Sequence, residues 1–254
     1  MAQYFKTLNY KLLKAVSLIS FIIVLLFISS FISKPNSAKF ITDSWKNNRI
    51  TIDTPDQRLK VTLPKNGKLI AGKPVGKNWI SLLPSLEGWN VDTNYWHLSN
   101  GVLHGDYPGG KLHNYTWTKK QYKDFELQAV VRLDGKEANS GVCIRIQPTD
   151  ADNAPGYQVD MGPGYWGCLW EERKAGMVQK FPEDLADKLV KSKDWNHYYI
   201  IAEGHHIQAW LNGVKTIDTV HAAGFDTGSI GFQLCHGDKH TIVDVKSLYI
   251  KETR

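Results

Sequence analysis

The sequence predicts an all-β fold, a two-sheet antiparallel β-sandwich of jelly-roll type with an N-terminal hydrophobic helix. From Trp79 onward, short runs rich in β-branched and aromatic residues are separated by turn residues, and apolar and polar side chains alternate within each run. A period of two buries one face of a strand and leaves the other in water. Only Glu183–Lys191 has a helical pattern. Strands without intervening helices favour two sheets packed face to face.

Turn residues separate the predicted strands. Ser99-Asn100-Gly101 and Glu203-Gly204 are hairpin signals, because Asn and Gly tolerate a positive φ, and Asn212-Gly213 turns the chain once more. The strands indicated by the alternation are Trp96–Leu98, Val102–Leu103, Asp124–Leu133, Gly141–Gln147, Tyr157–Met161, Tyr198–Ala202, Ile207–Leu211, Ser229–Cys235 and Thr241–Lys251.

The N-terminal residues 1–38 are typical of a signal peptide or a signal anchor. Three lysines precede an apolar run from Ala15 to Ile32 that only serines interrupt. Lysines stay on the cytoplasmic side because moving them through a bilayer is costly. The run is longer than a usual signal-peptide core and near the length of a spanning helix, so cleavage and permanent anchoring both stay open. We expect a periplasmic or otherwise extracytoplasmic protein, attached to the membrane only if the segment is uncleaved.

The rest of the chain divides into a tether and a folded domain. Residues 39–78 are polar and rich in Pro and Gly, and we expect a tether with one strand near Leu59–Leu63. Residues 79–254 carry the strand pattern. The formal net charge of +6 is concentrated at the N-terminus, where residues 1–38 hold four lysines and no acid. The remainder is nearly neutral, which argues against binding to nucleic acid.

The cysteines indicate neither a disulfide framework nor a zinc knuckle. Cys143, Cys168 and Cys235 are too few and too widely spaced for either. One bridge between neighbouring strands is compatible with the sequence, and the odd number leaves at least one thiol free or paired between chains. We expect all three to be small strand residues.

Polar residues on the predicted outer strand faces form a candidate sugar site. Amides and carboxylates pair with hydroxyl groups, and an indole covers the apolar face of a sugar ring. A polar strand face is also what an ordinary surface presents, and an Arg beside an Asp is more often a surface ion pair than a site. The candidates are Arg145, Gln158, Asp160 and Gln233, which the alternation directs away from the core, together with Trp170, Glu171, Glu172 and His236.

A series of motifs in a fixed order resembles the 3-keto-disaccharide hydrolase family. The similarity covers residues 79–252, about two thirds of the chain. The family often has Phe-Arg-Asn near its last strand, where this chain has Ile242–Val245, so a role of that Arg is not carried over. The stretches are Trp79–Trp89, Trp96–Leu103, Tyr122–Leu127, Asn139–Arg145, Gly156–Asp160, Tyr165–Glu172, Asp194–Asn196, Trp210–Gly213 and Gly228–Gly237.

The resemblance implies a concanavalin-like sandwich that acts on glycosides oxidised at C3. A C3 ketone acidifies the C2 hydrogen, so a general base can remove it while the C1 substituent leaves. Water then adds, and the net result is hydrolysis. Base and acid stay unassigned. The resemblance makes Asp160, Glu171, Glu172 and His236 the candidate proton-transfer groups, Arg145 the enolate partner, Gln158 and Gln233 the hydroxyl binders, and Trp170 a substrate contact.

Metal use stays open at this point. A divalent ion could polarise the ketone, and the three carboxylates could hold one. His236 and His240 have a spacing that joins ligands on a helix but not across a glycine turn, so we do not expect them to form a metal pair. We predict an exported enzyme that cleaves 3-keto-glycosides or 3-keto-disaccharides, with a small carbohydrate as its partner. The alternatives are a non-catalytic, lectin-like carbohydrate-binding module and, less favoured, a structural envelope protein.

Overall fold

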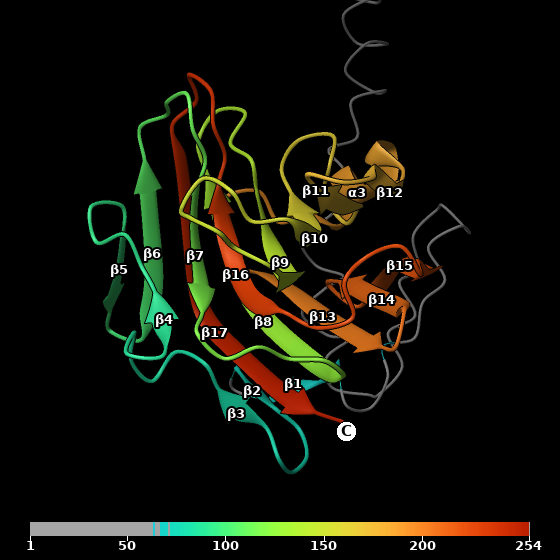
Figure 1. Cartoon of the computed structure of the whole chain (residues 1–254). Helices are drawn as coiled ribbons and strands as arrows, with labels where there is room; N and C mark the ends of the chain where they lie inside the picture. Colours follow the sequence, from blue (N-terminus) through green and yellow to red (C-terminus); the bar gives the residue numbers. More distant parts are fainter. Residues whose placement is uncertain (1–62, 64–66, 71, 254) are drawn as a thin grey trace, which may run out of the picture. The chain divides into compact units, whose positions relative to one another are not determined.

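Two antiparallel sheets packed face to face form the folded part of the chain. The computed structural model describes residues 63, 67–70 and 72–253 (Figure 1). Strands dominate this part of the chain, and Figure 1 shows the sheet that contains β7, β16 and β9 lying over the sheet that contains β17, β8 and β13. The predicted all-β sandwich is therefore confirmed.

The first sheet has seven strands in the order β12-β11-β10-β9-β16-β7-β4, and every neighbouring pair is antiparallel. Its central strands come from distant parts of the sequence, because β16 lies between β9 and β7. The strands are β4 (Trp89–Asn90), β7 (Asn114–Thr118), β9 (Ser140–Ile146), β10 (Gly156–Met161), β11 (Leu169–Glu172), β12 (Gly176–Gln179) and β16 (Ser229–Leu234).

The second sheet has eight strands in the order β15-β14-β13-β8-β17-β6-β5, and β3 (Ile80–Ser81) also pairs with β17. Helix α3 (Glu183–Leu189) lies between β12 and β13 in the chain, and β1 (Leu69–Ile70) pairs with β2 (Lys73–Pro74). The strands are β5 (Trp96–Ser99), β6 (Val102–Tyr107), β8 (Phe125–Asp134), β13 (Asn196–Glu203), β14 (His206–Leu211), β15 (Val214–Val220) and β17 (Thr241–Glu252).

All nine strands that the alternation predicts are present, and the predicted helix is present but ends two residues earlier. Strand β7 was not predicted, and neither were β4, β12 and β15. Except for Leu63, the expected strand near Leu59–Leu63 lies outside the described residues, as does the whole N-terminal segment 1–38. No helix in the part of the chain that the structure describes is long and apolar enough to span a membrane. The cysteines form no disulfide: all three are free.

The core lies between the sheets and explains why the alternation was readable. In β10, Tyr157, Val159 and Met161 are buried in the core cluster, whereas Gln158 and Asp160 between them point to the opposite face. The sheets also hold each other by a polar contact: the Tyr198 hydroxyl, from β13, donates to the backbone carbonyl of Asp160 in β10 at 2.7 Å. This contact fixes β10 at the position where its polar residues face outward.

The alternation fails at Arg145, in β9. Its φ is 52°, and the pairing of β9 with β16 shifts register between Ser229 and Gly231. Such a bulge adds one residue to a strand and reverses the faces beyond it. Ile144, before the bulge, points into the core. Ile146, two residues further on, would face the same way in a regular strand, but it packs on the outer face beside Tyr115.

Because of the bulge, the Arg145 side chain points into the sandwich and is fully buried. Its guanidinium donates to the backbone carbonyls of Lys123 and Gly204 and lies 3.4 Å from Asp124 Oδ1. Burial lowers the pKa of Arg145. The prediction that Arg145 belongs to the outer polar face is wrong, and the residue instead ties β9 to the opposite sheet.

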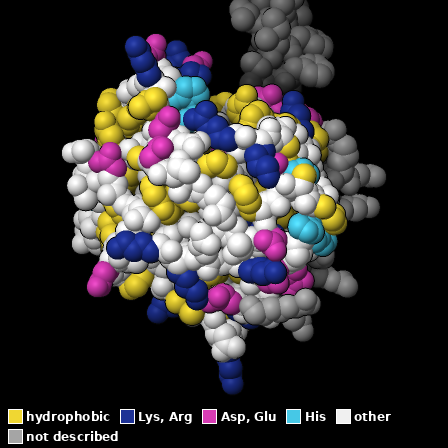
Figure 2. Space-filling model, in the orientation of Figure 1, with side chains coloured by type: hydrophobic (Ala, Val, Ile, Leu, Met, Phe, Trp, Pro, Cys, Tyr) yellow, Lys and Arg dark blue, Asp and Glu magenta, His cyan; other side chains and the backbone are white. Residues whose placement is uncertain are grey.

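Charged side chains of both signs are interspersed on the face drawn in Figure 2, without a broad patch of one sign. This distribution agrees with the nearly neutral charge of the chain beyond residue 38.

We predict that Arg145→Met lowers the free energy of unfolding by about 3 kcal/mol, because buried carbonyls and Asp124 lose a charged donor. Denaturant unfolding measures the change. Arg173→Met is the matched control, since Arg173 also has a positive φ but its side chain is 47% exposed. We expect that control to stay within about 0.5 kcal/mol of the parent. Equal effects of the two substitutions would contradict a structural role for Arg145.

Candidate functional site

A cavity of about 570 Å³ lies on the outer face of the seven-stranded sheet. Strands β10, β11 and β16 supply its inner wall, and the connections β6–β7, β8–β9, β10–β11 and β16–β17 supply its rim. The size falls within the usual range for small-molecule sites, about 300–1,000 Å³. The wall residues are Gln158, Asp160, Trp170, Glu172 and Gln233.

The cavity brings together most of the residues predicted from the sequence. Those wall residues were all predicted, and His236 also lines the cavity. Arg145 and Glu171 do not line it. Arg145 is directed inward by the bulge, and Glu171 lies on the other side of β11. Consecutive strand residues point to opposite faces, so Glu171 and Glu172 could not both reach one site.

Glu171 is buried on the core side of its strand, opposite Tyr157 in the pairing of β10 with β11. Its carboxylate lies 3.4 Å from Lys174 Nζ and 3.9 Å from His221 Nδ1, and it accepts from the backbone N–H of Ala175 at 3.3 Å. These contacts hold the turn after β11. The predicted set of three carboxylates at one site is therefore reduced to Asp160 and Glu172.

A chain of buried amides organises the wall of the cavity. Gln158 Nε2 donates to Asp160 Oδ1 at 2.7 Å and to Gln233 Oε1 at 3.1 Å. Gln233 Nε2 donates in turn to the Tyr115 hydroxyl at 2.6 Å and lies 3.2 Å from His113 Nδ1. The chain fixes which end of each amide is oxygen, because each link needs one donor and one acceptor.

Asp160 is the most strongly perturbed carboxyl in the cavity. Burial raises its pKa from 3.8 to about 8, although the hydrogen bond from Gln158 acts in the opposite direction. No cation contributes to this shift; the nearby carboxylate of Glu172 raises the pKa further. Asp160 is therefore largely protonated near neutral pH. When Asp160 is ionised, its negative charge helps to raise the pKa of four neighbouring groups: Cys143, Cys168, Tyr198 and Cys235.

Glu172 is half-buried, and burial also raises its pKa, against the lowering effects of Arg173, Gln233 and His236. Glu172 is more open to solvent than Asp160, so the two carboxyls occupy different environments within one cavity. Environments that separate two pKa values assign different proton-transfer roles to two acids. At the rim, Lys239 Nζ lies 3.3 Å from Glu137 Oε2.

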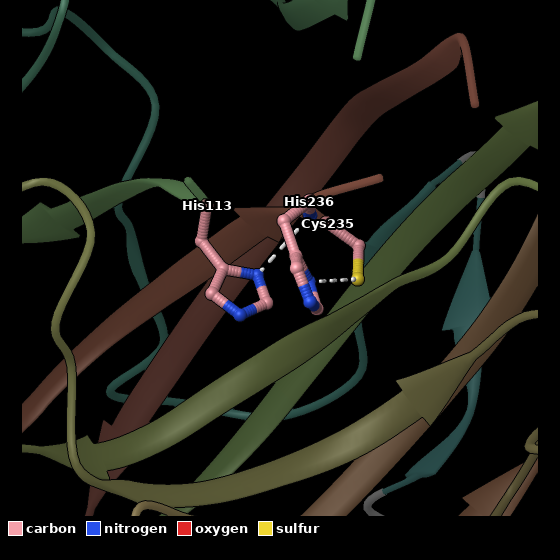
Figure 3. A group of neighbouring side chains, drawn as sticks. All are labelled: His113, Cys235 and His236. Carbon is pink, nitrogen blue, oxygen red and sulfur yellow. Dashed lines mark hydrogen bonds between the residues drawn. The ribbon is translucent and has the colours of Figure 1, made fainter. Parts of the chain in front are cut away.

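His113, Cys235 and His236 form a compact group at one end of the cavity (Figure 3). Their potential ligand atoms all lie within 4.8 Å of one another. The His113 and His236 rings have centroids 4.2 Å apart, and Cys235 Sγ lies 3.6 Å from His236 Nδ1. Burial and the neighbouring His236 lower the pKa of His113 to about 4, so its imidazole is neutral.

Sequence reasoning missed His113, Tyr165 and Lys239. His113 immediately precedes β7, and the pairing of Asn114 with Leu234 places it opposite Cys235. A register of this kind cannot be read from one strand alone. His240, which the sequence paired with His236 only by spacing, instead contacts Asp106 at 2.6 Å.

Two aromatic rings line the cavity together with the polar side chains of its wall. Trp170 and Tyr165 both line the cavity, with ring centroids 6.5 Å apart in an edge-to-face arrangement, and the Tyr165 side chain is exposed. Aromatic faces beside amides and carboxyls are suited to a ligand with an apolar face and hydroxyl edges. The fold and this cavity together define a β-sandwich protein with a polar, aromatic-lined cavity of small-molecule size.

The chain belongs to the family of 3-keto-alpha-glucoside-1,2-lyase-like domains, whose family model matches residues 78–251. The resemblance seen in the ordered motifs is thereby confirmed. The family places the chain among carbohydrate-active, glycosyl-hydrolase-like proteins. A search of curated proteins found no match to this chain.

Three solved structures are similar to this chain. A protein from Parabacteroides distasonis described as a glycosyl hydrolase is 16% identical, with a TM-score of 0.52 over 70% of this chain and 95% of that one. Another from the same organism is 24% identical, with a TM-score of 0.49 over 68% and 98%. The carbohydrate-binding module CBM66 from Bacillus subtilis is 15% identical, with a TM-score of 0.48 over 65% and 96%. The first of these three structures, at 16% identity and a TM-score of 0.52, shows a likeness of fold alone.

We predict that Asp160→Asn stabilises the protein at alkaline pH. The pKa of the Asp160 carboxyl is about 8 in the folded chain and near the ordinary 3.8 in the unfolded chain. As pH rises, the unfolded chain therefore releases this proton at a lower pH than the folded chain does. The stability of the parent therefore falls as pH rises from 4 to 8. An amide in place of the carboxyl removes that loss, so the free energy of unfolding at pH 8 should be higher in Asp160→Asn than in the parent, by on the order of a few kcal/mol.

Denaturant unfolding of both proteins from pH 4 to pH 9 measures this difference. Asp187→Asn, at an exposed position of α3, is the control and is expected to follow the parent at every pH. Parallel curves for the parent and Asp160→Asn would contradict a buried, protonated Asp160.

Proposed function

We propose that this protein cleaves 3-keto-glycosides by elimination across C1 and C2 followed by addition of water. The observation that carries the proposal is the pair of carboxyls with separated environments, Asp160 and Glu172, in a cavity of sugar size within a chain of this family. The C3 ketone of such a substrate makes the C2 hydrogen acidic, so the chemistry requires one base and one acid within reach of the bound sugar ring.

The environments favour Glu172 as the base and Asp160 as the acid. Glu172 is the more exposed carboxyl, whereas Asp160 is buried and retains its proton near neutral pH. Glu172 takes the C2 proton, the C1–O bond breaks, and Asp160 gives its proton to the leaving oxygen. Water then adds at C1 of the resulting enone and gives its proton to Asp160, while Glu172 returns its proton to C2, so both carboxyls regain their starting states.

Other cavity residues have supporting roles in this proposal. The enolate oxygen that forms at C3 needs a cation or a hydrogen-bond donor. Lys239 at the rim stabilises it, a role that the family resemblance had assigned to Arg145. Gln158 and Gln233 line the cavity and hold its polar wall in place through their mutual hydrogen bond, and Trp170 with Tyr165 covers the ring. Fixed donors contribute to rate because they need no reorganisation as charge develops.

We predict that the purified full chain releases sugar from a 3-keto-disaccharide. Glu172→Gln should lower kcat/KM roughly 10²–10⁴-fold, the usual contribution of a general base. Asp160→Asn should have an effect of that order on a disaccharide but a much smaller one on a 3-keto-glycoside with a nitrophenol leaving group, because nitrophenolate departs without protonation. Chromatography and nitrophenol absorbance measure the two reactions.

Glu171→Gln is the matched control, since it changes a neighbouring carboxyl on the opposite face of β11 and should leave kcat/KM of the folded protein near that of the parent. Failure of the parent to release sugar from any 3-keto-glycoside, with or without added metal, would overturn the proposal. Saturable sugar binding that survives both cavity substitutions, without turnover, would identify a lectin-like module instead.

We further propose that the chain is exported, on the strength of the lysine-flanked apolar run from Ala15 to Ile32. A C-terminal fusion to a reporter enzyme that is active only outside the cytoplasm is expected to be active when expressed in bacteria. Deletion of residues 15–32 should abolish that activity, and the size of the fused chain distinguishes a cleaved signal from an anchor. Equal reporter activity with and without the run would contradict export.

A further inference from the structure

The group formed by His113, Cys235 and His236 has a geometry that the proposed sugar chemistry does not use. The pairing of β7 with β16 carries on past Asn114 and Leu234, so His113 and Cys235 lie opposite each other on the cavity side. Figure 3 shows the His236 ring between the His113 ring and the Cys235 thiol. Three side chains from two chain segments thus direct soft or borderline donor atoms to one place.

These donors suit one class of ion. Thiolate and imidazole bind Zn²⁺ and similar transition-metal ions, whereas Mg²⁺ and Ca²⁺ select oxygen ligands. Three protein ligands with a fourth position for water or substrate is the pattern of zinc sites that act on bound molecules, as opposed to closed structural sites with four.

The distances permit an ion after a small adjustment. With bonds of about 2.0–2.3 Å, two ligands of a tetrahedral ion lie roughly 3.3–3.8 Å apart. The present ligand atoms lie within 4.8 Å, so the widest pair must close by about one ångström. His236 is exposed, so its side chain can make that movement. An ion that binds His113 through Nδ1 replaces two donors there, the backbone N–H of His236 at 3.3 Å and the Gln233 amide at 3.2 Å.

We propose that His113, Cys235 and His236 bind one divalent transition-metal ion of the Zn²⁺ class, with an open coordination position facing the cavity. Binding replaces the Cys235 S–H bond by a sulfur–metal bond and releases one proton to solvent. An ion at this end of the cavity can polarise an oxygen of a bound molecule. That last role rests on the proposed function, whereas binding of the ion does not.

Protection of Cys235 from alkylation tests the site without any substitution. The full chain is treated with iodoacetamide with and without Zn²⁺, and each cysteine is followed by peptide mass spectrometry. Cys143 and Cys168 are buried, so Cys235 is the cysteine that reacts in the folded protein. We expect one equivalent of Zn²⁺ per chain to protect Cys235 and Mg²⁺ to give no protection. Replacement by Co²⁺ should produce a thiolate-to-metal absorption band.

Substitutions then locate the ligands. Loss of an outer-shell partner alone weakens metal affinity roughly 10–100-fold, so His113→Ala, Cys235→Ser and His236→Ala should each weaken Zn²⁺ affinity by about 100-fold or more. Cys235→Ser should also abolish the Co²⁺ band. His205→Ala, at the exposed tip of the β13–β14 hairpin, is the control and should bind like the parent. Thermal unfolding of the metal-free variants checks that each is folded.

Two results would overturn the site. One is alkylation of Cys235 in the parent at the same rate with and without Zn²⁺, and the other is full Zn²⁺ affinity in His113→Ala and His236→Ala. Turnover of a 3-keto-disaccharide is measured on the same samples. Zn²⁺ binding without turnover would overturn the proposed function and leave the site standing, whereas turnover without Zn²⁺ binding would do the reverse.

Discussion

The chain of hydrogen bonds through Gln158 and Gln233 is the constraint on which the cavity depends. Both amides are almost fully buried, so an unpaired group on either would cost about 1–3 kcal/mol. The two side chains meet across β9, which lies between their strands. They can do so because Gly141 of β9 faces the cavity: a Cβ there would lie 2.2 Å from Gln158 Cγ. One glycine thus allows two distant strands to share one polar wall.

The outline of the fold and much of this wall could be predicted from the sequence, because alternation in a strand is a local property. Gln158 and Asp160 alternate with core residues in an unbroken strand, and Gln233 does the same in β16. Arg145 could not be placed in this way, because the positive φ and register shift in β9 reverse the faces at that position. Periodicity reports orientation only where the strand has no bulge.

The remaining differences concern pairing between strands. His113 became a site residue only through the register of β7 against β16, and β7 itself was not predicted. For Glu171 the prediction was wrong in the opposite direction. Glu171 and Glu172 are adjacent in the sequence and were both placed in the site, but neighbouring residues of a strand face opposite sides of the sheet. Lys239 and Tyr165 reach the cavity from connections whose paths are set by tertiary contacts. Side-chain direction within a strand is thus more readily predicted than which strands and loops meet.

The amide chain also joins the two chemically distinct ends of the cavity. Asp160 accepts from Gln158, and Gln233 donates to Tyr115 while lying within hydrogen-bond distance of His113. A change at the His113 end therefore alters what Gln233 can donate to, and Gln158 passes that change to the carboxyl. Asp160 is sensitive to such a change because burial dominates its pKa and no cation offsets it. An ion at His113 would act on Asp160 through this chain as well as through its charge, so the proposed ion and the acid would form one electrostatic unit.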